Sequence, residues 1–401
     1  MKINKLISWK IPVIIFYSVL VLFTVFHHEP WRDEAQAWLI ARDIPLFSIF
    51  TQMGYEGSPA LWHIILTPFV KSGLPYITEN LLHALVAIFI VIIFIYKSPL
   101  PIFTKILFVF SYFMAYEYAV IARSYNLSIL LLFLIATYYG KRFESPVRHA
   151  IFIFLLYNTN VHSFFIASSL LIVFVYEGYI NKYFTYKFYG TVSLIVLGAL
   201  TAFFQILPYE EAANTGILNQ RFWYAPGKAV MKSFFPLYAN LDIYVWLGLI
   251  PVLLTIVYLV KVSWSALFIL LFSYAGLSYI FIFKHFGGLR HQGFILIILI
   301  FVIWISTYYY KKETLLKIKI FPLKQIKLLV FLVLILNTYL LISIWPAFRF
   351  HYNDYKHSFS GSKEMAKFLN YNSFEDKILV ADRSSNCSGL LPHLTVIFIL
   401  T

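Results

Sequence analysis

Long apolar runs recur along this chain and constrain its fold more than any other feature. A membrane-spanning helix needs roughly 17 to 25 mainly apolar residues, and runs of that kind occupy most of the 401 residues. Only 12% of the residues are charged, whereas a soluble domain carries roughly 25%. The sequence therefore predicts an all-α polytopic membrane protein.

We expect about eleven transmembrane helices separated by short polar loops. The run 60–70 is also apolar, but it contains His63 and Pro68 and is short for a span, so we expect it to lie at the membrane interface. The fifth span is short as well. The predicted spans are 11–26, 80–96, 103–119, 124–139, 149–160, 163–176, 188–207, 243–260, 264–283, 293–310 and 328–345.

The charges predict the orientation. With the N-terminus in the cytoplasm, the inner loops hold 17 of the 32 Lys and Arg residues but only three of the 18 Asp and Glu residues. This follows the positive-inside rule, and anionic inner lipids account for the high charge without a nucleic-acid partner. The first apolar run lacks a signal-peptide cleavage pattern, and we interpret it as a retained span of a plasma (inner) membrane protein. The single cysteine, Cys387, excludes an intramolecular disulfide and a thiolate metal site.

Two regions are expected: a transmembrane domain at 1–345, with long outer loops at 27–79 and 208–242, and an outer, water-soluble tail at 346–401. The tail pattern predicts a short helix at 362–369 and a strand at 377–381. So small an α/β unit cannot close a stable domain alone. We therefore expect this tail to be incomplete or to dock on the membrane part.

The first outer loop carries the acids of greatest interest. Asp33 and Glu34 lie shortly after the first span, and Glu56 adds a third carboxylate later in the same loop. A helix is predicted at 33–42, with Ala35, Trp38 and Leu39 forming a stripe that can lie on the membrane. Asp33 can be an N-cap, forming a capping box with Gln36, or a general base that deprotonates a hydroxyl; both roles can coexist.

This layout resembles the membrane-embedded GT-C glycosyltransferases. The resemblance is carried by the acidic pair after the first span and by Tyr55-Glu56-Gly57-Ser58-Pro59 followed by an apolar helix. It is greatest to the branch of protein O-mannosyltransferases, lipid A aminoarabinose transferases and rhizobial lipid A sugar transferases. The layout extends over 1–345, although the specific motifs cover only some 35 residues.

The resemblance implies an inverting transferase that moves a sugar from a polyprenyl-phosphate-type lipid to a hydroxyl of a lipid, glycan or protein at the outer, periplasmic face. Asp33 matches the family's candidate base. Glu34 and Glu56 match neighbouring acids that shape the pocket, and Asp33 with Glu56 could hold a divalent cation such as Mg or Mn. No nucleotide is expected, because the site opens away from the cytoplasm.

The second outer loop departs from the family, because Arg123 stands where relatives often carry an acid. That weakens a metal-bridged acid pair and suggests that Arg123 contacts the donor phosphate. Charge builds on that phosphate as the glycosidic bond breaks, so cations are required there. Four other cationic or imidazole side chains of the outer loops are candidates to contact the phosphate: Arg221, Lys284, Arg290 and His291. Each could instead be a simple interfacial anchor.

The remaining candidates are polar groups at helix ends. The sugar or acceptor is expected to contact Tyr55, Tyr125, Asn160 and His162, although such groups also satisfy bent helix ends. His27, His28 and Glu29 could ligate a metal, but adjacent histidines lack the i, i+4 spacing of helical ligands.

Two other classes of protein remain open. A transporter or flippase usually places ionisable residues near the membrane midplane, and often shows inverted repeats; the sequence has few such residues and no repeat. A non-catalytic membrane scaffold would not need Asp33 or Glu56.

Overall fold

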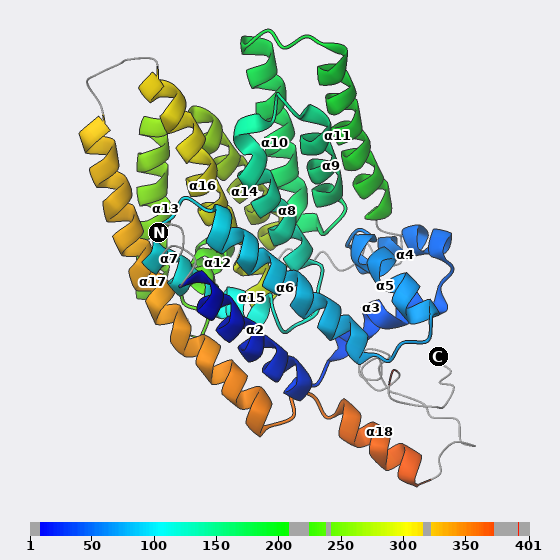
Figure 1. The fold of residues 1–401 in the computed structure, drawn as a ribbon. Helices are drawn as coiled ribbons and strands as arrows, with labels where there is room; N and C mark the ends of the chain where they lie inside the picture. Colours follow the sequence, from blue (N-terminus) through cyan, green and yellow to red (C-terminus); the bar gives the residue numbers. More distant parts are fainter. Residues whose placement is uncertain (1–8, 208–223, 238–241, 316–321, 373–391, 393–401) are drawn as a thin grey trace, which may run out of the picture.

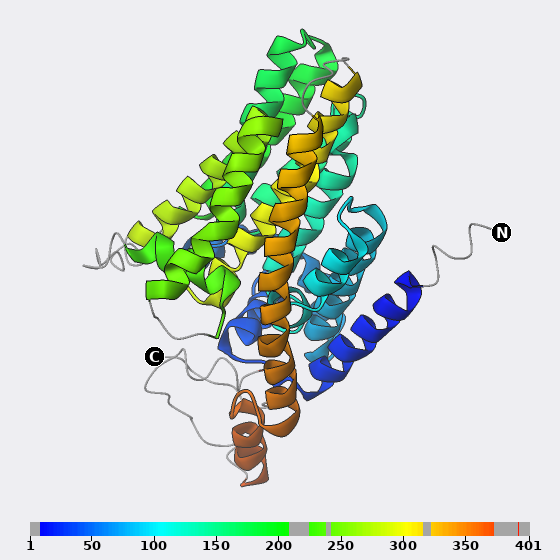
Figure 2. The same ribbon diagram turned by 90° about the vertical axis from the view of Figure 1, so that its left-hand side faces the viewer.

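The computed structural model of the protein describes residues 9–207, 224–237, 242–315, 322–372 and 392 (Figures 1 and 2). These residues form 17 α-helices and no strand. The predicted all-α class is therefore confirmed for the described part of the chain. Arg221 and the predicted strand at 377–381 lie outside the described residues.

In the described part of the chain, eight helices are long and apolar enough to cross a membrane. Each overlaps one of the predicted spans, because a long apolar run is stable in lipid as a helix that satisfies its own backbone hydrogen bonds. The eight helices are α2 (Lys10–His27), α6 (Ile77–Lys97), α10 (Val161–Ile180), α11 (Tyr186–Gln205), α13 (Asp242–Val262), α14 (Trp264–Phe283), α16 (Phe294–Leu315) and α17 (Pro322–Lys356).

The other three predicted spans form shorter helices. Residues 103–119 are not one helix: α7 (Ile102–Val109) ends early, and a π-helical turn, η2 (Phe113–Glu117), follows. The break arises because the Ser111 hydroxyl donates to the carbonyl of Phe108 (2.7 Å), while the amide of Tyr112 donates to Ser343 of α17 (3.0 Å). The other two are α8 (Tyr125–Tyr138), extended by η3 (Tyr139–Lys141), and α9 (Pro146–Tyr157).

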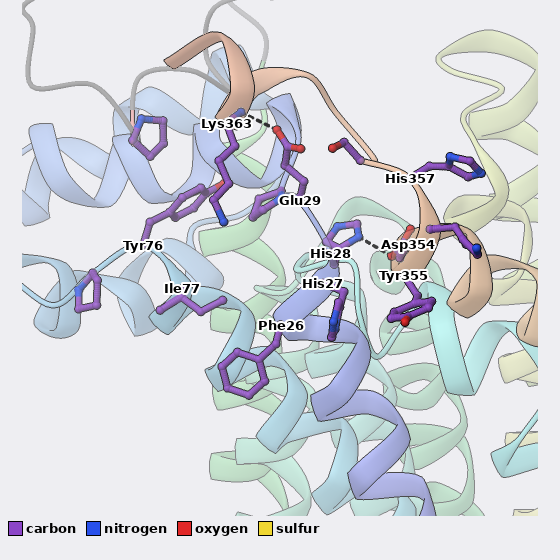
Figure 3. A pocket seen from close by; sticks show the side chains of 15 residues that line it. Phe26, His27, His28, Glu29, Tyr76, Ile77, Asp354, Tyr355, His357 and Lys363 are labelled. Carbon is purple, nitrogen blue, oxygen red and sulfur yellow. Dashed lines mark hydrogen bonds and ion pairs between the residues drawn. The ribbon is translucent and has the colours of Figure 1, made fainter. Parts of the chain in front are cut away.

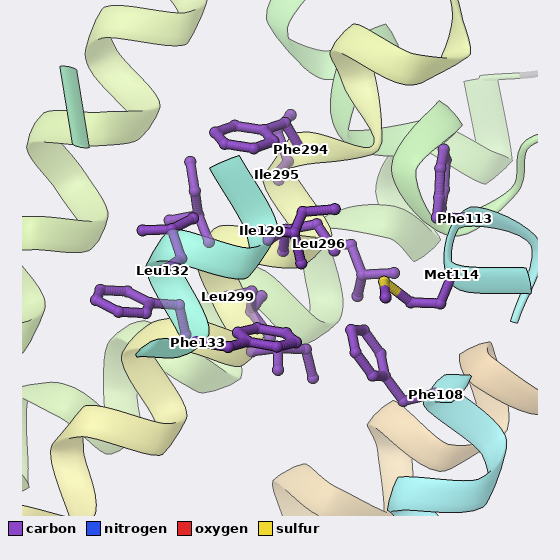
Figure 4. Close-up of a cluster of buried hydrophobic side chains, with 14 of the residues drawn as sticks. Phe108, Phe113, Met114, Ile129, Leu132, Phe133, Phe294, Ile295, Leu296 and Leu299 are labelled. Atoms are coloured by element: carbon purple, nitrogen blue, oxygen red, sulfur yellow. The ribbon is translucent and has the colours of Figure 1, made fainter. Parts of the chain in front are cut away.

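The core of the bundle surrounds α16. Its residues from Phe294 to Ile305 are all buried, as expected for a helix that is apolar on every side. Figure 4 shows aromatic rings of α7 and α8 meeting this helix. Phe133 stacks on Phe94 with ring centroids 5.2 Å apart and lies 5.5 Å from the ring of Trp304.

The first outer loop folds into α3 (Arg32–Asp43), the turn η1 (Leu46–Ser48), α4 (Ile49–Glu56) and α5 (Leu61–Lys71). Figure 1 shows them gathered beside the first residues of α6. The expectation that Ala35 and Trp38 lie on the membrane is wrong. Both are buried against Trp62 and Leu66 of α5, because the apolar segment at 60–70 forms a helix that gives this stripe a protein partner.

The last long helix, α17, ends near the start of α3. The Thr24 hydroxyl of α2 lies 2.6 Å from His351 Nδ1 of α17, so α2 and α17 end at the same end of the bundle, which we call the α3 end. Residue 345, the expected domain boundary, lies inside α17, which continues to Lys356. The helix α18 (Ser362–Tyr371) follows and lies below the end of α17 in Figure 2. It confirms the helix predicted at 362–369.

Candidate functional site

Asp33 lies in the first turn of α3. The helix begins at Arg32, with Trp31 as its N-cap, and the Glu34 carboxylate accepts the Trp31 amide (3.1 Å). The interpretation of Asp33 as the N-cap is therefore wrong, because the N-cap is Trp31, two residues earlier, and the Glu34 side chain accepts the amide of Trp31. The Asp33 side chain is left available for other partners.

Three guanidinium groups meet at Asp33. Its carboxylate pairs with Arg290, and also with Arg32 through Nε (3.1 Å). Arg123 donates to the main-chain oxygen of Asp33 (2.6 Å). Burial opposes ionisation, but the charges of Arg123 and Arg290 outweigh it, and the pKa of Asp33 is lowered from its usual value. Asp33 is thus an anion held among cations that come from three distant parts of the chain.

Glu56 ends α4 beside this group. The following residue, Gly57, has a φ of 61°, the left-handed conformation that terminates many helices. Glu56 accepts a hydrogen bond from Gln36 Nε2 (2.5 Å). Burial raises its pKa more than Arg123 and Gln36 lower it, and the charge of Asp33 raises it further. The pKa values of the two acids are pushed in opposite directions, a pattern typical of sites that use one carboxylate as an anion and another as a proton carrier.

Glu34 has a different environment. It is fully buried and accepts four hydrogen bonds, from the His28 ring, the Trp31 amide, the Asn80 side chain (3.2 Å) and the Ala122 amide (2.7 Å). With its oxygens engaged in this way, Glu34 positions the start of α3 against α6 and the loop before α8. It holds in place the loop that presents Arg123.

His28 extends this network to the end of the chain. Its Nε2 lies 3.2 Å from Glu34 and its Nδ1 lies 2.7 Å from Asp354 of α17. Burial alone would lower its pKa, but the two carboxylates prevail and raise it to about 10. A charged imidazolium therefore links α3 to α17, whereas the neighbouring His27 lies against the carbonyl of Phe23 on α2.

The loop 284–293 brings Arg290 to Asp33. It contains α15 (Leu289–Gln292), and Gly287 before it has a φ of 70°. A Cβ at Gly287 would lie 2.4 Å from His291 Nδ1, so glycine is required there. The Tyr118 hydroxyl donates to the carbonyl of Arg290 (2.6 Å), and the guanidinium lies 5.3 Å from the Trp31 ring centroid.

His162, Tyr125 and His291 form a second group next to Arg290. The Tyr125 hydroxyl lies 3.3 Å from His162 Nδ1. The His291 ring centroid lies 4.8 Å from that of His162 and 5.5 Å from that of Tyr125. His162 Nε2 is buried and has no hydrogen-bond partner among the described residues. This nitrogen is available to a ligand.

Three of the predicted residues lie apart from this arrangement. Lys284 is exposed at the end of α14 and forms no ion pair with the described residues. Tyr55 is 54% exposed on α4. Asn160 caps α10 by accepting the Ser163 amide (3.0 Å), and its amide nitrogen donates to Ser128. The structure brings together Asp33, Glu56, Arg123 and Arg290, with Tyr125, His162 and His291 beside them.

The donor set at Asp33 does not suit a divalent cation. Its carboxylate already faces Arg32 and Arg290, and Arg123 also affects Glu56; these cations would repel a metal ion. Within the described ranges, no three His, Cys, Asp or Glu side chains are grouped so that they could hold a metal. A guanidinium–carboxylate cluster of this kind is better suited to an anionic ligand.

Several polar atoms near the cluster lack partners. Trp31 Nε1, His63 Nδ1 and Arg290 Nε are buried without a hydrogen bond to any described residue. Buried polar atoms are normally satisfied, so unsatisfied ones suggest a missing ligand or water. Sequence reasoning missed Trp31, Arg32 and His63 as members of the site; the only available signal was the nearness of the first two to Asp33.

No protein-family model, curated protein or solved structure matches this chain. The site must therefore be interpreted from its own geometry.

Proposed function

We propose that the protein is a GT-C-type, inverting glycosyltransferase that moves a sugar from a polyprenyl-phosphate-type lipid to an acceptor hydroxyl. The observation that carries this proposal is the meeting of Asp33 with Arg123 and Arg290 at the α3 end. Sugar transfer requires a base that deprotonates the attacking hydroxyl and, close to that base, cations that stabilise the departing phosphate. This cluster contains both.

The directions of the helices support an outer-face site. Both α2 and α17 run toward the α3 end. Because successive membrane crossings alternate in direction, the number of crossings from α2 to α17, counting both, must be odd. Eight long helices alone give an even number, whereas adding the segments of α7, α8 and α9 gives the eleven crossings expected from the sequence. With the basic loops in the cytoplasm, the α3 end then faces the periplasm, where lipid-linked rather than nucleotide-linked sugars are the donors.

In the proposed reaction, the acceptor oxygen bonds to the anomeric carbon while the bond from that carbon to the phosphate oxygen breaks. The acceptor proton passes to the Asp33 carboxylate, and the electron pair leaves with the lipid phosphate. Arg290 and Arg123 hold the negative charge that develops on this phosphate. Attack on the face opposite the departing phosphate inverts the anomeric configuration.

The ion pair between Asp33 and Arg290 suggests how the base becomes active. With Arg123 and Arg290 close to it, Asp33 has a lowered pKa and is a weak base. A donor phosphate competes for the same guanidinium, and its arrival would draw Arg290 away and raise the basicity of Asp33. Donor binding and base activation are then coupled, which would limit the reaction to sites loaded with donor.

The test uses membranes containing the protein, incubated with tritium-labelled mannose, glucose or galactose on undecaprenyl phosphate. Transfer of label to lipid, glycan or protein is expected for the wild type, with a loss of about 10²- to 10⁴-fold for Asp33→Asn. The matched control is Asp43→Asn, an exposed acid of the same helix that pairs with Arg42, and it should retain full transfer.

Full activity of Asp33→Asn would remove it as the base. Substrate flux into proteoliposomes without any sugar transfer would instead support the transporter alternative. If substitutions at Asp33 and Glu56 alter no chemical activity in these membranes, the scaffold alternative is favoured.

A further inference from the structure

A cavity lies at the α3 end, and its lining includes His28 and Glu29 but not Asp33. Its volume is about 640 Å³, within the range of roughly 300 to 1,000 Å³ typical of small-molecule sites. Figure 3 shows it between the end of α2, the start of α6 and the segment that joins α17 to α18. The cavity plays no part in the proposed sugar transfer.

The carboxylates that line this cavity already have partners. Glu29 accepts the Lys363 main-chain amide (2.5 Å) and the Ser360 hydroxyl (3.1 Å). Asp354 accepts the Tyr116 hydroxyl (2.8 Å) and pairs with His28. The carboxylate oxygens are therefore occupied by protein donors, and the charge of Asp354 is offset by His28.

The two lysines of the lining differ from His28, whose charge is already paired with Glu34 and Asp354. The ammonium groups of Lys356 and Lys363 are exposed, and neither forms an ion pair with a described residue. In Figure 3, Lys363 points from α18 toward the start of α6. The imidazoles of His27 and His357 line the same space. The charge that remains available to a ligand is positive.

The cavity also has an apolar wall at membrane depth. Phe26 is 66% exposed on the last turn of α2, and Ile77 begins α6 beside it. Both helices are membrane spans by length and composition, so their ends lie near the lipid headgroups whichever face this is. Tyr76 and Tyr355 add the aromatic rings that are common at this depth.

We infer that this cavity binds the phosphate group of an anionic membrane lipid. Lys356 and Lys363 supply the charge, since a lysine acts on a phosphate as a point charge, and Phe26 and Ile77 contact the adjoining chains. A lipid held here would lie against His28 and Glu29, which link α2 to the start of α3. Free phosphate shares the same chemistry but would gain nothing from the apolar wall.

The test is titration calorimetry on the full-length protein in neutral detergent, with dihexanoyl phosphatidic acid as the probe. Binding is expected to weaken at least about tenfold in the double variant Lys356→Gln/Lys363→Gln. Lys367→Gln is the matched control, an exposed lysine of α18 outside the lining, and it should bind as the wild type does. Gel filtration and thermal melting confirm that each variant is folded.

Dihexanoylglycerol, which lacks the phosphate, should bind much more weakly than the phosphatidic acid. Equal binding of the two, or unchanged binding by the double variant, would overturn the inference. Inorganic phosphate bound as tightly as the lipid would show that free phosphate, not a lipid, occupies the site. Because Asp33→Asn should bind the probe normally, this result is independent of whether sugar transfer is found.

Discussion

Two arginine–carboxylate pairs lie at opposite ends of the bundle, and they differ in how completely their atoms are used. At the end away from α3, Arg142 binds Glu177 Oε2 through Nη2 (2.5 Å) and Nε (3.1 Å). The other oxygen, Oε1, accepts the hydroxyls of Tyr309 (2.6 Å) and Ser265 (2.8 Å). This pair joins α8, α10, α14 and α16.

The pair of Asp33 and Arg290 is equally shielded but less complete. The side chains are 12% and 15% exposed, against 10% and 12% for Glu177 and Arg142. Yet Arg290 Nε has no partner among the described residues, and the nearby His63 and His162 also have buried, unpartnered nitrogens. Burial is therefore similar, and the two pairs differ in the guanidinium itself: Arg142 donates through Nε, Nη1 and Nη2, whereas Arg290 keeps a buried Nε–H without a partner among the described residues.

After Asp33→Asn, the largest effect is expected at Arg290. Replacing Arg290 with Ala should lower kcat/KM for sugar transfer by about 10²- to 10³-fold, because a donor to the departing phosphate is lost. The measurement is transfer from the labelled undecaprenyl phosphate sugars. Arg42→Ala removes an arginine from an exposed pair on the same side of the molecule and should have no effect. Equal losses of transfer in Arg290→Ala and Arg42→Ala would show that the Asp33–Arg290 pair has no special role in catalysis.

His28 should make stability depend on pH. Its folded pKa, about 10, lies above the usual 6.5, so its contribution is fully present below pH 6.5 and is lost as the pH rises toward and through 10. The melting temperature of the detergent-solubilised wild type should therefore fall between pH 7 and 10. The His28→Gln variant should melt lower at pH 7 and show a flatter profile. An identical slope in both proteins would mean that His28 is not the titrating clamp.

A smaller change is expected at the opposite end. Glu177→Gln should lower the free energy of unfolding by about 1.5 to 3 kcal/mol, since a hydrogen-bonded charge is lost opposite Arg142. Sugar transfer per folded molecule should not change. Chemical denaturation in detergent gives the first quantity and the labelled-sugar assay the second. A loss of transfer without loss of stability would give this pair a role beyond structure.

The smallest effect is expected at Gly287. Gly287→Ala places a side chain in the left-handed conformation, at a cost of about 1 to 2 kcal/mol, and its Cβ would displace His291. Thermal melting should show a modest loss, and transfer should fall because Arg290 lies on the same loop. Gly190→Ala is the control, because a Cβ there meets nothing within 4 Å. Identical behaviour of the two variants would show that the loop tolerates the change.

The positions of the membrane-spanning helices could be predicted from the sequence, but the contacts of the loop residues could not. Each of the eight long helices follows an apolar run, and the helix at 362–369 was also expected. The N-cap of α3 was not, because Asp33 and Gln36 fit the capping-box spacing, whereas Trp31 is not a residue type that favours N-caps. The break at Ser111 could not be foreseen either, since it depends on a hydrogen bond with Ser343, 231 residues away.

The sequence by itself determined the all-α class, the positions of the long helices and the acids of the first outer loop. These follow from hydropathy and local spacing, which act over a few helical turns. Only the tertiary structure decided that Asp33 meets Arg290, 257 residues later, while Glu34 is enclosed by His28 and Asn80. Adjacent residues of a helix point about 100° apart, so packing against different neighbours gave two consecutive acids different environments.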